Sequence, residues 1–224
     1  MPTRQGQRYR WHVAPRAPLE LFHSLPDVHP TITQTLYRLG YSTPAAVREF
    51  LDSDGKEPDD ADPLLLIDMP RAVERLLRAK ARNERVAIFT DYDVDGVGSA
   101  AILVIGLRML GFDPFFYLPN RFTEGYGLSL HGVGELIKRG AQTILTADCG
   151  ITGHEAVEFA RSKGVEVIVT DHHLPGATLP DTIVIDPHRR DCPYPHKELC
   201  GTGVAFKLLQ ALADELHPDG RRSM

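Results

Sequence analysis

The stretch VAIFT-DYDVDG, residues 86–96, runs from β-branched and apolar residues into three aspartates, and it decides the fold. Two further stretches repeat this arrangement: TILTA-DCG at 143–150 and VEVIVT-DHH at 165–173. Short runs of this composition, bounded by polar and turn residues, indicate β-strands. In an open α/β sheet, ligands bind outside the carboxyl ends of the parallel strands. We therefore expect the acidic and imidazole side chains after these strands to converge at one edge.

Helical patterns alternate with the strands from residue 68 onward. We expect helices at about 70–83, 97–110, 130–139, 153–163 and 203–216, and strands at 86–90, 114–118, 143–147, 165–170 and 182–185. Strands separated by helices of ten or more residues are typical of βαβ units, whose right-handed crossovers align the strand ends. The sequence therefore predicts an α/β fold with a doubly wound, mostly parallel sheet over residues 64–224.

Residues 1–63 predict a small helical N-terminal lead followed by an acidic linker. Four arginines precede TITQTLYRLG (31–40) and TPAAVREFL (43–51), which read as helices capped by Thr31 and Thr43, the second with Pro44 in its first turn. From Asp52 to Pro63 the chain carries six acidic residues and one lysine, which accounts for the whole net charge of −5. The linker begins like a calcium loop but lacks the later ligand positions.

The overall charge and the cysteine content restrict the class of protein only broadly. Because the rest of the chain is formally neutral, charge neither favours nor excludes a phosphate-bearing ligand. Three cysteines without a C-x-x-C pair favour a reducing compartment. No signal peptide is evident, and the apolar run 100–107 is too short to span a bilayer. We expect a soluble, cytoplasmic protein with no membrane partner.

Asp91, Asp93 and Asp95 occupy alternate positions after the first strand. On an extended chain, alternate side chains point the same way, so all three carboxylates would face one spot. Two like charges 4 Å apart repel by roughly 4 kcal/mol at an effective dielectric of 20, unless a cation lies between them. A single helix cap would need only one carboxylate. The triplet therefore predicts a divalent metal site.

A dinucleotide-binding loop is the competing interpretation of the same segment. Gly96, Gly98 and Ala101 fit the pattern G-x-G-x-x-A after a strand. However, three carboxylates just before the loop would repel a pyrophosphate, and the next strand ends without an acidic residue for the ribose. The metal site is the better explanation.

The other two strand ends supply the remaining candidate ligands. Asp148 alone could cap the helix that follows it, but at the centre of a shared site it could bridge two cations. His172 and His173 follow a very apolar strand, where one imidazole could bind metal and the other a substrate phosphate. Two loop histidines without a role are the alternative.

Several weaker candidates stay open at this point. Arg121 could hold a phosphate and Tyr126 could stack on a base, although a half-buried tyrosine in a Gly-Tyr-Gly turn is equally compatible. Asp186-Pro187-His188 is either a further part of the rim or a turn. Gly201-Thr202-Gly203 either presents amides to a phosphate or allows close helix packing.

A zinc site is a further candidate, because His188, Cys192, His196 and Cys200 recur every four residues. That spacing would place the four side chains on one face only if the segment were a helix. Pro193 and Pro195 do not permit a helix there.

Taken together, DYDVDG, PNRFTEGYGLS, TADCGIT and VTDHH resemble the DHH phosphoesterase superfamily and, within it, the RecJ-type single-stranded-DNA exonucleases. The resemblance runs from RWHV (10–13) to LCGTGVAFKLL (199–209). It implies a two-metal phosphodiesterase that uses Mn²⁺, with Mg²⁺ as an alternative. Such an enzyme digests single-stranded DNA from the 5′ end in repair and recombination, with a single-strand-binding protein as a candidate partner.

The resemblance also implies roles for individual residues. Asp91, Asp93 and Asp95 would form the first metal-binding cluster, Asp148 would bridge the ions, and His172 would bind metal. His173 would contact the scissile phosphate. Mixed carboxylate and imidazole ligands suit Mn²⁺ better than Mg²⁺, which prefers oxygen ligands and keeps its waters.

One departure from the family pattern concerns the end of the chain. Family members carry a further ligand Asp in a Gly-Thr-x-Ala-Asp-type segment and then a second domain, whereas this sequence stops at Met224. We therefore expect the N-terminal part of a longer enzyme, truncated before its last motif. The alternatives are a DHH phosphoesterase acting on nanoRNA or small phosphates, and a non-catalytic fragment.

Overall fold

The computed structural model describes residues 13–52 and 61–217. The chain divides into two compact units, Met1–Pro58 and Asp59–Met224. The boundary expected from the sequence, between residues 63 and 64, stays a prediction. Most of the expected acidic linker and three of the four N-terminal arginines lie outside the described residues.

The first unit is helical, with α1 (Leu19–His23), α2 (Pro30–Arg38) and α3 (Pro44–Leu51) around a small apolar core. The Thr43 hydroxyl caps α3 by accepting the Ala46 amide at 3.2 Å, as expected. The Thr31 cap was wrong: His29 is the N-cap of α2, and its Nδ1 accepts the Thr31 amide at 3.3 Å. Pro30 needs no amide partner and has a helical φ, so the helix starts there. The short helix α1 was not expected.

The second unit confirms the predicted α/β fold with a parallel sheet. Its five strands lie in the order β2-β1-β3-β4-β5, and every neighbouring pair is parallel. The strands are β1 (Val86–Thr90), β2 (Phe115–Tyr117), β3 (Thr143–Ala147), β4 (Glu166–Thr170) and β5 (Ile183–Ile185). The helices are η1 (Pro63–Leu65), α4 (Met69–Ala81), α5 (Val94–Met109), α6 (Leu130–Lys138), α7 (His154–Ser162) and α8 (Gly201–Leu216).

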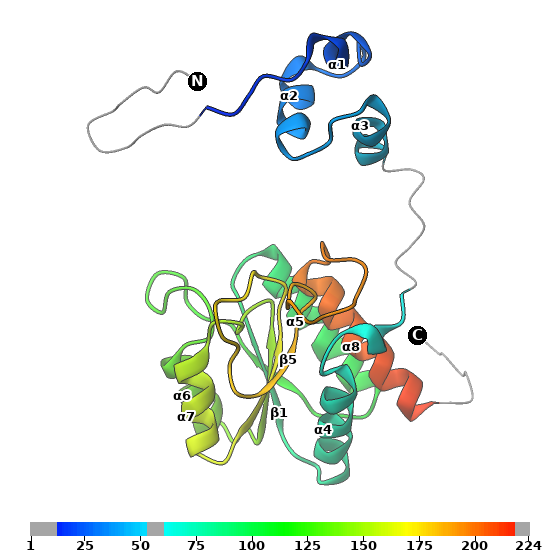
Figure 1. The fold of residues 1–224 in the computed structure, drawn as a ribbon. Coiled ribbons are helices and arrows are strands. Elements are labelled where there is room, and N and C mark those ends of the chain that lie inside the picture. The colour runs from blue at the N-terminus through cyan, green and yellow to red at the C-terminus, as the bar shows by residue number, and fades with distance from the viewer. Residues whose placement is uncertain (1–12, 53–60, 218–224) are drawn as a thin grey trace. The chain divides into compact units, whose positions relative to one another are not determined.

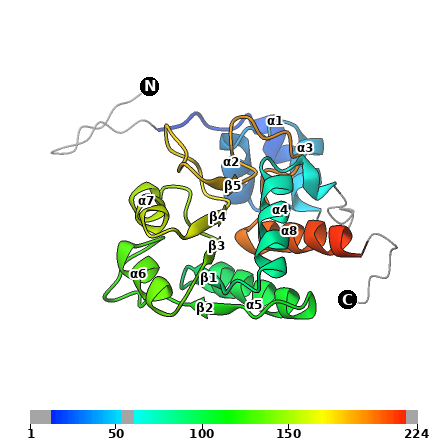
Figure 2. The ribbon, with the colours of Figure 1, turned by 90° about the horizontal axis from the view of Figure 1, so that it is seen from below.

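Helices cover both faces of this sheet (Figures 1 and 2). Because strand side chains alternate between faces, Ile88 and Leu145 join a core with α4, α5 and α8, whereas Phe89 and Ile144 join a second core with α6 and α7. Over residues 13–52 and 61–217, we find no helix whose length and apolar character would let it cross a membrane.

The start of α5 differs from the prediction and changes the interpretation of the three aspartates. The helix begins at Val94 because the Asp93 carboxylate caps it, accepting the Gly96 amide at 3.0 Å. Asp95 therefore lies in the first helical turn, so the three aspartates do not share an extended segment. A β-carbon on Gly96 would lie 2.5 Å from the Asp91 carbonyl oxygen, so this glycine permits a close backbone approach.

Candidate metal centre

The carboxyl ends of the three central strands carry one aspartate each. Asp91 follows β1, Asp148 follows β3 and Asp171 follows β4, and β3 pairs with both other strands. All three aspartates are buried, with exposures of 0–1%. The predicted convergence of these stretches at one edge of the sheet is thus present in the fold.

Within residues 13–52 and 61–217, Asp148, His172 and His173 form a group of potential metal ligands. Each offers a ligand atom, and these atoms all lie within 4.8 Å of one another. His172 Nε2 lies 3.1 Å from Asp148 Oδ1 and 3.5 Å from Asp95 Oδ2. A carboxylate from the β3 end, two imidazoles from the β4 end and a carboxylate from α5 therefore meet at one place.

Asp148 is held in an unfavourable environment for a free carboxylate. Its φ of +61° is left-handed, a conformation that costs a non-glycine residue about 1–3 kcal/mol. Burial, reinforced by the charges of Asp95 and Asp93, raises the pKa of Asp148 to about 8. A cation beside this side chain would relieve both the desolvation and the repulsion, so the donor set fits a divalent metal.

Asp91 is likewise a buried carboxylate whose surroundings disfavour its ionised form. Its Oδ1 accepts the Tyr92 amide at 2.6 Å, while its buried Oδ2 accepts no hydrogen bond of normal geometry from the described part of the chain. Burial raises its pKa, although hydrogen bonding from the Tyr92 amide and the Tyr126 hydroxyl acts in the opposite direction. Neither Asp91 nor the exposed Asp93 belongs to the tight group of Asp148, His172 and His173.

Asp95 joins two helix N-termini. Its Oδ2 accepts the Gly201 amide at 2.7 Å, and its Oδ1 accepts the Thr202 amide at 2.8 Å and the Thr202 hydroxyl at 2.6 Å. Burial acts to raise the pKa of Asp95, but these hydrogen bonds outweigh it and the pKa is lowered. The two α8 amides are therefore bonded to a carboxylate rather than free for a phosphate. A β-carbon on Gly201 would lie 2.5 Å from Asp148 Oδ1, which favours the close-packing interpretation of this glycine.

Asp171 has a role at the site that sequence reasoning missed. Its Oδ1 accepts the amides of His172 and His173 at 2.7 and 3.1 Å and lies 2.7 Å from His173 Nδ1. Its Oδ2 accepts the Ile151 amide at 2.8 Å. A carboxylate on one ring nitrogen fixes the tautomer and orientation of a histidine. The Asp-His adjacency at a strand end was the signal that pointed to this contact.

The Asp171 carboxylate also sets the charge of His173. Burial lowers the pKa of His173, but the hydrogen bond to Asp171 and nearby carboxylates more than offset this, so the pKa is raised. The other ring nitrogen, Nε2, lies 2.8 Å from the Tyr126 hydroxyl. Tyr126 therefore lies beside His173. Arg121 lies farther out, with its guanidinium carbon 5.1 Å from the centre of the Tyr92 ring.

The segment Asp186-Pro187-His188 borders the site from the end of β5. His188 Nδ1 lies 2.5 Å from the His172 carbonyl oxygen. Asp186 is fully buried, and burial raises its pKa to about 7. Farther along, Cys200 caps α8 through a 3.4 Å contact from the Gly203 amide, a structural role unlike that of a zinc ligand.

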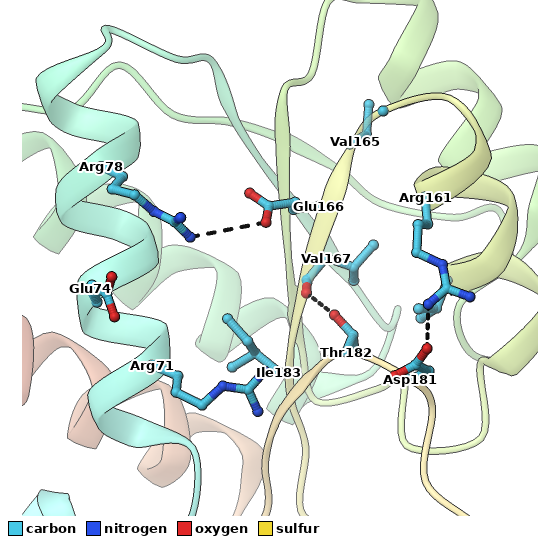
Figure 3. A pocket seen from close by; sticks show the side chains of 12 residues that line it. Arg71, Glu74, Arg78, Arg161, Val165, Glu166, Val167, Asp181, Thr182 and Ile183 are labelled. Carbon is cyan, nitrogen blue, oxygen red and sulfur yellow. Dashed lines mark hydrogen bonds and ion pairs between the residues drawn. The ribbon is translucent and has the colours of Figure 1, made fainter.

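A separate cavity of about 370 Å³ lies at the opposite, amino ends of β4 and β5. Figure 3 shows three arginines and three acidic residues around it. Its three arginines each have an acidic partner: Arg161 bonds Asp181, Arg78 lies 4.0 Å from Glu166, and Arg71 bonds Asp68, outside the cavity, at 2.7 Å. Paired charges leave little to attract a ligand, so the strand-end site is the better candidate.

Known proteins resemble this chain in sequence and in fold. The single-stranded-DNA-specific exonuclease RecJ of Bacillus subtilis is 37% identical over 218 residues, which are 96% of this chain and 27% of that protein. RecJ of Salmonella typhimurium is 50% identical over 151 residues, 66% of this chain and 26% of that protein. A crystal structure of exonuclease RecJ bound to manganese matches 67% of this chain and 38% of its own, with a TM-score of 0.63 and 41% identity.

The chain thus spans about a quarter of the length of the curated relatives that it matches. The model of the DHH family, N-terminal domain, matches residues 85–222, which contain all three strand-end aspartates and both histidines of the site. The chain therefore belongs to the DHH family.

Proposed function

We propose that this chain carries the catalytic site of a metal-dependent 5′-to-3′ exonuclease that hydrolyses phosphodiester bonds of single-stranded DNA. The observation that carries the proposal is the meeting of Asp148, His172 and His173 within 4.8 Å beside further carboxylates. The relatives named single-stranded-DNA-specific exonuclease support the reaction and the substrate. Roles in DNA repair and recombination, a cytoplasmic location and a single-strand-binding partner belong to the same proposal.

The proposed ligands are Asp91, Asp93, Asp95, Asp148 and His172. A mixed set of carboxylates and one imidazole favours Mn²⁺, with Mg²⁺ as the alternative. Two solved structures of RecJ relatives are described as bound to manganese, which supports the choice of ion. Bound divalent ions would lower the pKa of a water and stabilise the charge on the leaving oxygen.

The remaining steps belong to the protein's own residues. Asp148 lies at the end of β3, between the β1 and β4 ends, with its Oδ1 3.1 Å from His172 Nε2, so these two side chains would hold a metal together. His173, held at Nδ1 by Asp171, would exchange the Tyr126 hydroxyl at Nε2 for a nonbridging oxygen of the scissile phosphate. Its raised pKa favours the protonated ring, which can donate to that oxygen as negative charge develops.

The test compares two substrates in the presence of Mn²⁺: a 5′-phosphorylated single-stranded oligonucleotide and a dinucleotide. We expect stepwise release of mononucleotides from the 5′ end of the oligonucleotide and much slower cleavage of the dinucleotide. Preference for the dinucleotide would instead support the second candidate, a DHH phosphoesterase acting on nanoRNA or small phosphates. Cleavage of neither substrate, together with no Mn²⁺ binding, would contradict the proposal.

A further inference from the structure

Asp95, one of the proposed metal ligands, has both carboxylate oxygens bonded to the start of α8. Its Oδ1 accepts two hydrogen bonds, from the Thr202 amide at 2.8 Å and from the Thr202 hydroxyl at 2.6 Å. Among the described residues, its Oδ2 accepts one, from the Gly201 amide at 2.7 Å. Each carboxylate oxygen has about two lone-pair sites. Oδ1 is therefore fully occupied, whereas Oδ2 keeps one site.

Ser99 directs the Thr202 proton to the carboxylate. A threonine hydroxyl has one proton to donate, and Thr202 Oγ1 lies 2.6 Å from Asp95 Oδ1 and 3.1 Å from the Asp95 carbonyl oxygen. The buried Ser99 hydroxyl donates to that carbonyl oxygen at 2.7 Å. A hydrogen bond to a charged oxygen is also roughly twice as strong as one between neutral groups. The Thr202 proton is therefore donated to Oδ1.

Close packing of α5 against α8 fixes this arrangement. A β-carbon on Gly98 would lie 3.0 Å from Thr202 Oγ1, and one on Gly106 would lie 2.5 Å from Leu209 Cδ1. Glycine at these two positions lets the helices approach each other and leaves room for the Thr202 side chain. The Asp95 carboxylate, held between the two helices, has a fixed orientation.

The Asp95 oxygen that keeps a lone-pair site lies at the candidate metal centre. His172 Nε2 is 3.5 Å from Asp95 Oδ2 and 3.1 Å from Asp148 Oδ1. Asp148 Oδ1 is itself buried and accepts no hydrogen bond of normal geometry from residues 13–52 and 61–217. An ion held by these three side chains can therefore take a single oxygen from Asp95.

Ligation through one oxygen affects which divalent ion the site prefers. Ca²⁺ takes about six to eight oxygen ligands in a flexible geometry and accepts both oxygens of one carboxylate. Mn²⁺ and Mg²⁺ favour an octahedral set of ligands. A carboxylate that can offer both oxygens helps a site reach the larger ligand number of Ca²⁺. Fixing Asp95 so that it offers only Oδ2 removes that option.

We propose that Thr202 is a positioning residue that restricts Asp95 to ligation through one oxygen and thereby disfavours Ca²⁺ relative to Mn²⁺ at this centre. This inference rests on the proposed function and adds a residue that sets the ion selectivity of the same site. Thr202 acts through Asp95 and contributes no ligand atom of its own.

The test compares Thr202→Ser, which keeps the hydroxyl, with Thr202→Ala, which removes it, since both lose the same methyl group. The electron paramagnetic resonance signal of free Mn²⁺ gives the Mn²⁺ affinity, and competition against Mn²⁺ gives the Ca²⁺ affinity. We expect Thr202→Ala to weaken Mn²⁺ binding by about 10- to 100-fold, the usual loss for an outer-shell partner. The Ca²⁺ affinity should change by no more than a few-fold, because Asp95 can then offer both oxygens. Thr202→Ser should keep the wild-type ratio of the two affinities.

Thr182→Ala is the matched control, because the Thr182 hydroxyl also donates a hydrogen bond, to the Val167 carbonyl oxygen at the amino end of β4. This variant should change neither affinity. An unchanged ratio in Thr202→Ala, or an equal loss of both affinities, would overturn the selectivity role and leave the proposed function standing. No Mn²⁺ binding by the wild-type chain would overturn both.

Discussion

Asp148 is the residue on which the candidate site depends most. It is buried, left-handed and within 3.1 Å of His172, and its pKa is raised to about 8. Burial and the neighbouring negative charges disfavour an isolated carboxylate, and both become tolerable beside a cation. The sequence predicted the residue and its place at a strand end. The left-handed backbone could not be predicted, because Asp148 is not a glycine and nothing in the local residue pattern indicates a positive φ.

We predict that Asp148→Ala abolishes metal binding and activity while the protein stays folded. The substitution removes a buried carboxylate, so it should weaken Mn²⁺ binding by at least about 100-fold, more than the usual loss for an outer-shell partner. Isothermal titration with Mn²⁺ and thermal unfolding measure the two effects. Asp113→Ala, at an exposed aspartate before β2, is the control and should change neither. Retained turnover in Asp148→Ala would reject the bridging role.

The Asp171–His173 pair leads to a second prediction. His173→Ala should lower turnover by about 10²- to 10⁴-fold while Mn²⁺ affinity stays within a few-fold. Asp171→Asn should lower turnover by about 10- to 100-fold at saturating Mn²⁺, because the charge that orients the His173 ring and stabilises its protonated form is lost. If Asp171 acts through His173, the double variant will be no slower than His173→Ala alone. Loss of metal in His173→Ala would mean that the two histidines have exchanged roles.

Asp186 should make stability depend on pH. Burial raises its folded-state pKa to about 7, so the protonated form is favoured in the folded protein. Its stabilising contribution is complete below the unfolded pKa, near 4, and is lost as pH rises through 7, at up to about 1.4 kcal/mol per pH unit. Urea unfolding of the metal-free protein between pH 4 and 8 should show this decline, and Asp186→Asn should make it shallower, leaving the part due to Asp91 and Asp148. An unchanged slope in that variant would rule out Asp186 as the source.

At the scale of the elements, the hydrophobic patterns were enough to locate every strand of the sheet. The expected range of β1 is the observed one, and the pattern predicted β4 to within a residue. The start of α5 was predicted three residues late because Asp93, rather than a later residue, caps it. The link from Asp95 to Gly201 and Thr202 joins residues more than a hundred positions apart. No local pattern contains that information, so only the tertiary structure reveals it.

Glycines at the start of α5 and in α6 should respond oppositely to alanine. Gly96→Ala places a β-carbon 2.5 Å from the Asp91 carbonyl oxygen, and such a backbone clash should lower the free energy of unfolding by about 1–3 kcal/mol. Gly134→Ala, inside α6, meets nothing closer than 3.9 Å, so it should raise that free energy by up to about 1 kcal/mol. Denaturant unfolding of both variants tests this, and equal stability of the two would contradict the described packing.

At the scale of the whole molecule, the two units have separate cores. The core of the first unit draws on residues 17–47, whereas both cores of the second draw on residues from 61 onward. The sequence predicted a helical lead before an α/β domain, but amphipathic patterns do not say how two such units are placed relative to one another. All the proposed metal ligands lie in the second unit.

A chain beginning at Asp59 should therefore fold and bind Mn²⁺ as tightly as the 224-residue chain. Circular dichroism and Mn²⁺ titration of both chains provide the comparison. If removal of residues 1–58 abolished metal binding without unfolding the α/β unit, the first unit would have to contribute to the site.

The central claim is that the strand-end carboxylates and imidazoles share bound divalent ions. An anomalous-scattering map from crystals soaked in manganese tests it most directly. We predict peaks bounded by Asp148 and His172, and two ions, if both bind, would lie roughly 3.5–4 Å apart. The absence of any peak at this rim, or a peak confined to the cavity at the amino ends of β4 and β5, would contradict the account.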